Sequence, residues 1–261
     1  MSVTAILCIL VIVLSITVFM VWASASIRSG VYVRAFCREK TDRKVVYLTF
    51  DDGPHPPETE RVLDVLRERG ARATFFLIGS KVSGNKAVLR RMLEEGHALG
   101  LHTYSHAGTF PLLSFDKMLA DVNEGKRAVE SVAGKKISLF RPPFGVTNPT
   151  IAKVVRTLRL QTIGWDVRSF DTMFCKSSEH SCKQSGYSCK QSGHDWYVLV
   201  VERIMKQVRP GSVILLHDRL DGASDLLALL LDRLTASGYD FTRALPNTLI
   251  SSSDSSETNL S

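Results

Sequence analysis

The sequence alternates short apolar runs, rich in β-branched and aromatic residues, with longer segments of helical periodicity. The apolar runs fall at 45–50, 73–79, 98–102, 137–140, 160–165 and 212–217. The helical segments fall at 60–70, 86–96, 114–132, 148–158, 196–208 and 224–238. Six such units, with 239–242 as a candidate further strand, predict right-handed crossovers and a parallel sheet.

A parallel sheet of this kind is either open and doubly wound or closed into a barrel. No G-x-G-x-x-G or G-x-x-x-x-G-K-[ST] motif follows the first apolar run. The loops with which nucleotide-binding open sheets hold phosphate are therefore missing, which favours a barrel. We expect an α/β fold with one such domain at 44–248, preceded by a linker at 26–43.

The beginning of the chain has a different composition from the domain. No charged residue lies between Val3 and Ala25, and about 23 residues at ~1.5 Å each can cross a hydrocarbon core of ~30 Å. We expect residues 1–25 to be a retained transmembrane anchor, although Ala23-Ser24-Ala25 also has the form of a signal-peptide cleavage site. The basic residues that follow this segment would by themselves favour a cytoplasmic domain.

Two segments have little capacity to form a core. Three seven-residue copies, which begin at Cys175, Cys182 and Cys189, follow one another between Cys175 and Asp195 and account for a repetitive insertion at 175–194. A flexible insertion is the simpler interpretation, because C-x6-C-x6-C is not a usual metal-ligand spacing, but a metal or disulfide cluster is the alternative. The polar tail 249–261 is expected to be disordered.

The charge pattern limits the partners. The chain has 33 basic and 26 acidic residues and a net charge of +7, and the basic residues are spread along it. A nucleic-acid-binding surface is therefore not expected. We expect a monomer.

Polar residues suited to catalysis stand at the C-terminal ends of the predicted strands. Taken alone, each is explained as well by turn chemistry or by a hydrogen-bonded loop side chain as by a role in catalysis. Together they lie on the face where barrel active sites are built. They are Asp51, Asp52, His102, His106, Arg141, Asp166 and His217.

The two histidines are four residues apart, and in a helical turn this spacing aims both rings at one point, as metal sites require. Thr103 stands where a zincin protease has its glutamate, so that class is not favoured.

The ordered motifs TFDDGP, HTYSH, RPPFG, W-D-x-x-S-x-D and LLHD resemble those of the polysaccharide deacetylase family, also called the NodB-homology domain. The resemblance covers about 44–245, which is nearly all of the predicted domain. It implies a distorted, often incomplete (β/α) barrel, consistent with the six to eight strands expected here. It also implies hydrolysis of an N-acetyl or O-acetyl group on a polysaccharide.

The resemblance implies a division of labour between the two adjacent carboxylates. Asp52, His102 and His106 would hold a divalent metal, usually zinc, while Asp51 would be the general base. Two imidazoles and one carboxylate leave positions on the metal open for water and for a substrate oxygen.

The resemblance assigns further roles around this centre. His217 would be the general acid, Arg141 would orient Asp51, and Asp171 would hold His217 as imidazolium. The backbone N–H of Phe144 would stabilise the oxyanion, and the substrate-binding residues would be Phe144, Pro143, Trp165 and Leu215.

The chain departs from the family pattern at one motif. Many members have D-x-x-D-W, whereas residues 168–172 read RSFDT. Asp171 is kept, but the first aspartate and the tryptophan are lost, so one wall of the substrate groove differs.

These observations predict a membrane-anchored, metal-dependent deacetylase of an envelope glycan such as peptidoglycan or a chitin-like polymer. A polymeric envelope substrate implies a domain outside the cytoplasm, and we give this more weight than the charge bias. The alternatives are a metal-dependent hydrolase of a small amide in the cytoplasm and a non-catalytic glycan- or metal-binding module. Against the binding module, both Asp51 and His217 are present.

Overall fold

The computed structural model describes residues 2–174 and 195–246. The three cysteine-containing repeats and the predicted tail at 249–261 lie outside the described residues.

Seven strands form one parallel sheet in the order β5-β4-β3-β2-β1-β7-β6. They are β1 (Val46–Gly53), β2 (Ala73–Leu77), β3 (Ala98–Leu101), β4 (Leu139–Phe140), β5 (Gln161–Thr162), β6 (Val167–Arg168) and β7 (Ser212–His217). The predicted α/β barrel of six to eight strands is confirmed. The candidate strand at 239–242 was wrong, because this segment pairs only through an isolated bridge from Asp240 to Val45. The two-residue β6 takes its place in the count.

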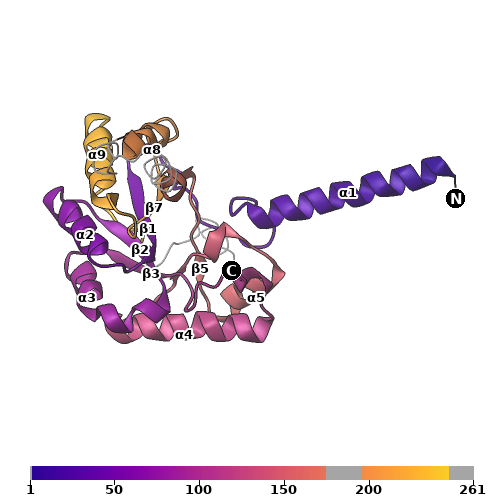
Figure 1. Ribbon diagram of the computed structural model, residues 1–261, viewed down its shortest axis with the longest axis horizontal. Coiled ribbons are helices and arrows are strands. Elements are labelled where there is room, and N and C mark those ends of the chain that lie inside the picture. Colours follow the sequence, from indigo (N-terminus) through magenta and orange to yellow (C-terminus); the bar gives the residue numbers. More distant parts are fainter. Residues whose placement is uncertain (1, 175–194, 247–261) are drawn as a thin grey trace, which may run out of the picture.

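The sheet is curled, as the connection between its two edge strands requires. β5 and β6 lie at opposite ends of the strand order, yet only residues 163–166 join them. That connection spans at most about 18 Å, at ~3.6 Å per residue. The two edges therefore lie close together, and the sheet forms an incomplete barrel (Figure 1).

Part of the segment expected to be a linker pairs with the barrel, beside β5 and at the start of β7. Phe36 pairs with Ile163 beside β5, and Arg38 pairs with Ser212 at the start of β7. The backbone N–H of Phe36 donates to the Thr162 carbonyl over 2.9 Å. Ile27 and Val33 of the same segment are buried. These residues are packed on the barrel and pair with its open edges.

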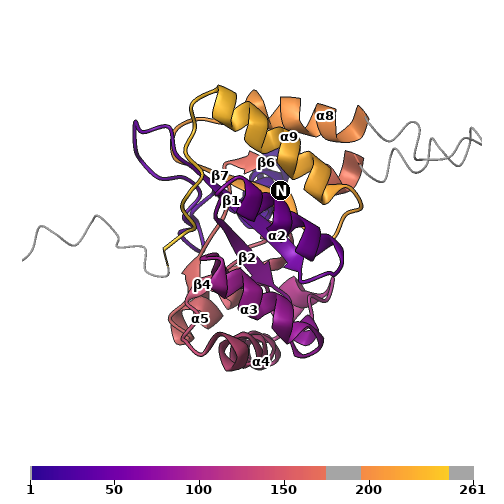
Figure 2. The ribbon, with the colours of Figure 1, turned by 90° about the vertical axis from the view of Figure 1, so that its left-hand side faces the viewer.

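All six predicted helices are present and cover the outer face of the sheet. They are α2 (Glu58–Glu68), α3 (Lys86–Glu94), α4 (Phe115–Ala133), α5 (Pro149–Thr157), α8 (Asp195–Met205) and α9 (Ala223–Ala236). Neighbouring helices are in contact in the order α8-α9-α2-α3-α4-α5, which follows the strand order. Figure 2 looks onto α9, α2, α3 and α4 of this layer.

The two-residue period of β1 divides its side chains between the two faces of the sheet. Val46, Leu48 and Phe50 belong to the large core that the sheet shares with the helices. Tyr47 belongs to a smaller cluster inside the barrel, with Phe76, Leu139, Ile163 and Val213. Because Thr49 and Asp51 lie two and four positions after Tyr47, the same alternation directs their side chains toward the barrel interior.

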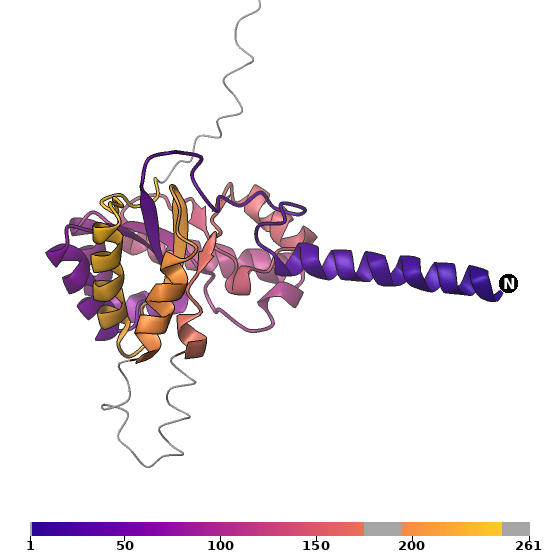
Figure 3. The same cartoon turned by 90° about the horizontal axis from the view of Figure 1, so that it is seen from above.

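The chain begins with α1 (Val3–Ala25), the one helix of the described chain that is long and apolar enough to cross a membrane by length and composition. It projects away from the barrel (Figures 1 and 3). Its C-terminal end is in contact with the domain, where Ala23 is buried and the Thr147 N–H donates to the Ser24 carbonyl over 2.9 Å.

We predict that a domain beginning at Ala23 is more stable than one beginning at Lys40. The shorter protein loses the edge pairing of residues 36–39 and the buried side chains Ile27 and Val33, whose burial is worth about 1.5–3 kcal/mol each. The difference in free energy of unfolding, measured by urea denaturation of both truncations, should be about 3 kcal/mol or more. Equal stabilities would show that this segment contributes nothing to the barrel.

Candidate active site

A cavity of about 200 Å³ opens at the C-terminal ends of the strands. Eight of the eleven residues predicted for the site line it. The lining residues are Asp51, Asp52, His102, His106, Phe144, Gly145, Trp165, Arg168, Phe170, Thr172, Leu215, His217 and Arg219. The other three predicted residues, Arg141, Pro143 and Asp171, are buried and do not belong to this lining.

The adjacent carboxylates reach the same cavity because β1 is irregular at its end. In a regular strand, neighbouring side chains point to opposite faces. Asp52 has a left-handed backbone (φ 72°), and the pairing of β1 with β2 shifts register between Asp51 and Gly53. This local bulge turns the Asp52 side chain back toward the face that Asp51 occupies.

Asp51 is held by a fully buried arginine. Arg141 Nη1 donates to Asp51 Oδ1 over 2.7 Å and to Thr49 Oγ1 over 2.9 Å. Arg141 Nε and Nη2 donate to the carbonyls of Ile163 and Gly164. The arginine side chain is 0% exposed and that of Asp51 is 6% exposed. One carboxylate oxygen is thus fixed by Arg141, while Oδ2 lies 4.0 Å from His102 Nε2.

Asp52, His102 and His106 form a group that could hold a metal ion, with ligand atoms all within 4.8 Å of one another. Asp52 Oδ1 lies 3.5 Å from His102 Nε2 and 3.3 Å from His106 Nε2. A tetrahedral site with bonds of about 2.0–2.2 Å separates its ligand atoms by about 3.3–3.6 Å, and both distances from Asp52 to the histidines fall in that range.

The tautomer and charge of the imidazoles also suit a metal. His102 Nδ1 lies 2.7 Å from the Arg141 carbonyl, an acceptor that requires the proton on Nδ1 and leaves Nε2 free as a ligand. Burial, and then the neighbouring His102, lower the pKa of His106, which favours the neutral ring. The two rings meet without a helical turn: Thr103 and His106 have left-handed backbones, and residues 102–106 form an irregular loop.

His217 ends β7 and is paired with Asp171. Asp171 Oδ1 lies 2.8 Å from His217 Nδ1, and Asp171 Oδ2 accepts from the His217 backbone N–H over 2.9 Å. Burial alone would lower the pKa of His217, but Asp171, followed by Asp51 and Asp52, raises it to about 9. The imidazolium is therefore the stable form at neutral pH, with Nε2 4.0 Å from Asp52 Oδ2.

Asp52 is the second group with a strong shift. Burial alone would raise its pKa, but His102, His217 and His106 and the hydrogen bond from Arg219 together lower it to about 2. The carboxylate is therefore charged at neutral pH.

The RPPFG segment forms one wall of the cavity. Its residues Pro143–Gly145 form the short helical turn η4, in which Phe144 has a left-handed backbone (φ 61°). The Phe144 ring lies 5.3 Å from that of His106. A side chain at Gly145 would come within 2.4 Å of the Trp165 ring, so glycine allows Trp165 to close this side of the cavity.

One of the strand-end residues does not belong to the site. Asp166 accepts hydrogen bonds from the Ser212 hydroxyl and the Val213 N–H, at the beginning of β7, where His217 lies at the end. Its expected position on the active face was wrong, because β6 begins only after it. Five other residues line the cavity but were not predicted as site residues: Gly145, Arg168, Phe170, Thr172 and Arg219. Arg219 stands two residues after His217, and this proximity was the available signal.

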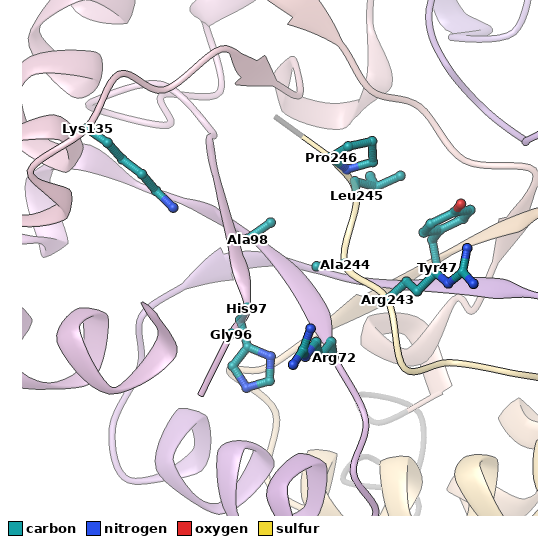
Figure 4. A pocket seen from close by; sticks show the side chains of 10 residues that line it. All are labelled: Tyr47, Arg72, Gly96, His97, Ala98, Lys135, Arg243, Ala244, Leu245 and Pro246. Atoms are coloured by element: carbon teal, nitrogen blue, oxygen red, sulfur yellow. The ribbon is translucent and has the colours of Figure 1, made fainter. Parts of the chain in front are cut away.

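A larger cavity of about 460 Å³ lies at the opposite ends of the strands. Its lining includes Tyr47 at the start of β1 and Ala98 at the start of β3. The side chains of Lys135 and Arg243 lie on opposite sides of it (Figure 4). Its lining contains no carboxylate. In barrels this face serves stability and the other face carries chemistry, so we assign the active site to the smaller cavity.

Comparisons with known proteins agree with this assignment. The family model for polysaccharide deacetylases matches residues 38–163. A peptidoglycan-N-acetylglucosamine deacetylase from Bacillus cereus is 33% identical over 203 residues, covering 77% of this chain and 86% of the relative. A chitooligosaccharide deacetylase from Azorhizobium caulinodans is 30% identical, covering 66% and 73%.

A solved structure shares the fold as well. Peptidoglycan deacetylase PdaC from Bacillus subtilis is 30% identical with a TM-score of 0.62, covering 77% of this chain and 87% of that one. The sequence likeness extends over most of the domain and accompanies the same curled barrel. The chain belongs to the polysaccharide deacetylase family.

Proposed function

We propose that the protein removes N-acetyl groups from an envelope polysaccharide and that it uses zinc at Asp52, His102 and His106. The observation that carries the proposal is the pair of adjacent carboxylates in two different environments. Asp52 faces the two histidines, whereas Asp51 is bound by Arg141. A metal ligand and a general base are the two roles that such a division supplies.

A bound divalent metal would polarise the acetyl carbonyl and make water more acidic. Asp51 accepts the proton of the attacking water through Oδ2, because Arg141 already occupies Oδ1. Arg141 thereby orients the base. The backbone N–H of Phe144 stabilises the oxyanion, and Trp165 and Leu215 enclose the acetyl methyl group.

His217 completes the reaction as the general acid. Its pairing with Asp171 keeps it protonated until it transfers a proton to the leaving amine. After transfer, Asp171 keeps the neutral ring in place through the proton on Nδ1. Pro143, buried in the same turn as Phe144, completes the proposed substrate-binding set.

We further infer that α1 is a retained anchor and that the domain lies outside the cytoplasm. Cleavage at the A-x-A sequence would remove residues that pack on the domain, since Ala23 is buried and its carbonyl, with that of Ser24, accepts hydrogen bonds from Thr147. Long domains translocate largely regardless of their charge, so we give the polymeric substrate more weight than the basic residues that follow α1. Thr147 follows η4 closely, so the anchor ends beside the wall of the active site.

The experiment that tests the function is acetate release from N-acetylated glycans. Zinc-loaded protein should release acetate from chitotetraose and from peptidoglycan, chelation should abolish release, and added zinc should restore it. The alternatives predict otherwise: a small-amide hydrolase would act on acetamides but not on polymers, and a binding module would retain glycans without releasing acetate.

We predict that Asp51→Asn lowers kcat by about 10²–10⁴, the usual contribution of a general base, while zinc stoichiometry stays near that of the wild type. His106→Ala is the matched contrast and should lose bound zinc, because it removes one of three protein ligands. Both quantities are measured by acetate assay and by metal analysis after dialysis. If Asp51→Asn lost zinc to the same extent, the roles of the two carboxylates would have to be revised.

We predict that Asp171→Asn moves the basic limb of the pH profile of kcat/KM to lower pH. Asp171 raises the pKa of His217, and activity falls as pH rises through the pKa of a general acid. Without the carboxylate, His217 loses its proton earlier in a titration toward alkaline pH. The wild-type and variant profiles should share their acidic limb. An unchanged basic limb would mean that Asp171 does not control His217.

A further inference from the structure

The rim of the active-site cavity carries two arginines that the proposed reaction does not use. Arg168 and Arg219 both line the cavity, which they approach from different segments of the chain. Arg168 belongs to β6, and Arg219 follows β7. Arg141, in contrast, is buried and neutralised by Asp51.

Arg168 is held in place without being neutralised. Its guanidinium lies 4.6 Å from the centre of the Phe170 ring and 5.9 Å from that of Trp165. Its side chain is exposed, and among the described residues no carboxylate forms an ion pair with it. Cation–π contacts orient a guanidinium but leave its charge available to an anion.

The guanidinium of Arg203 adds a further positive charge beside Phe170. Arg203 lies 4.5 Å from the centre of the Phe170 ring, close to the 4.6 Å of Arg168. Arg203 Nε is buried and has no hydrogen-bond partner within the described part of the chain. Phe170, which lines the cavity, thus contacts two cations.

Arg219 uses only one of its hydrogen-bond donor nitrogens within the described chain. Its Nε donates to Asp52 Oδ2 over 2.8 Å, and its side chain is 36% exposed. The hydrogen bonds found among the described residues use none of the N–H groups on its two terminal nitrogens. A metal that draws on the charge of Asp52 would leave the charge of Arg219 in excess. The terminal nitrogens would then be available to an anion at the cavity mouth.

We propose that Arg168 and Arg219 form a carboxylate subsite, so that the enzyme prefers an acidic N-acetylated glycan with a free carboxylate near the acetyl group over a neutral chitin-like chain. The inference rests on the proposed deacetylase function and specifies its substrate class. The planar guanidinium matches a carboxylate in a two-point hydrogen bond, which gives orientation as well as charge recognition.

The test compares kcat/KM for three substrates: glycan strands whose muramic acid residues carry free carboxylates, the same strands after conversion of the carboxylates to methylamides, and neutral chitotetraose. The wild type should prefer the free carboxylates over the methylamides by about tenfold at low salt, and the preference should shrink at high salt. A ratio of kcat/KM near one between the free-carboxylate and methylamide strands at low salt would overturn the proposed subsite.

We choose Arg168→Gln for the mutational test, because replacing Arg219 would also remove its hydrogen bond to Asp52. The preference for carboxylates over methylamides should fall about fivefold, mainly through KM, and Arg168→Lys should retain part of it. Arg90→Gln on α3 makes the same change in net charge away from the cavity and should leave the preference unchanged. An equal fall in Arg90→Gln would show a general charge effect and contradict the proposal.

A binding measurement separates recognition from turnover. In an Asp51→Asn background, calorimetric titration with the free-carboxylate strands should show the same loss of affinity on Arg168→Gln, and the methylamide strands should show none. Chitotetraose separates the two proposals. If no substrate releases acetate, the function itself fails; if chitotetraose is turned over but carboxylates confer no advantage, only the subsite fails.

Discussion

The ion pair between Arg141 and Asp51 links the fold to the chemistry. Arg141 is fully buried, and its guanidinium joins β1 to the carbonyls that follow β5. Its own carbonyl lies 2.7 Å from His102 Nδ1, so one residue positions both the proposed base and a proposed metal ligand. Removing one partner of such a pair would leave a buried charge uncompensated, at a cost of about 3–5 kcal/mol. The curled sheet and the active site therefore depend on the same contact.

Backbone strain is concentrated where this contact meets the cavity. Of the six non-glycine residues with positive φ in the described chain, four line the cavity, namely Asp52, His106, Phe144 and Phe170, and a fifth, Thr103, directly follows the lining residue His102. Each such conformation costs about 1–3 kcal/mol and persists only where the surrounding packing holds it. At Asp52 the strain has a specific effect, because it places two adjacent carboxylates on one face of a strand.

The sequence allowed the main elements and most of the site to be predicted, because long periodic segments and strand-end motifs are local signals. β6 could not be predicted, since a two-residue strand has no period of its own. The packing of Phe36 and Arg38 on the barrel depends on where distant edges meet. Asp166 was misplaced because the short strand β6, which begins only after it, could not be foreseen. The role of Arg219 follows from its contact with Asp52, which only the folded chain displays.

The central claim is that two neighbouring carboxylates have separate roles, one toward a metal and one toward water. Anomalous diffraction at the zinc edge, from crystals grown with zinc, tests it most directly. We expect one peak at about 2.0–2.2 Å from Asp52 Oδ1, His102 Nε2 and His106 Nε2, with Asp51 outside the coordination sphere and still bound to Arg141. A zinc ion coordinated by Asp51, or one bound away from these three residues, would contradict the account.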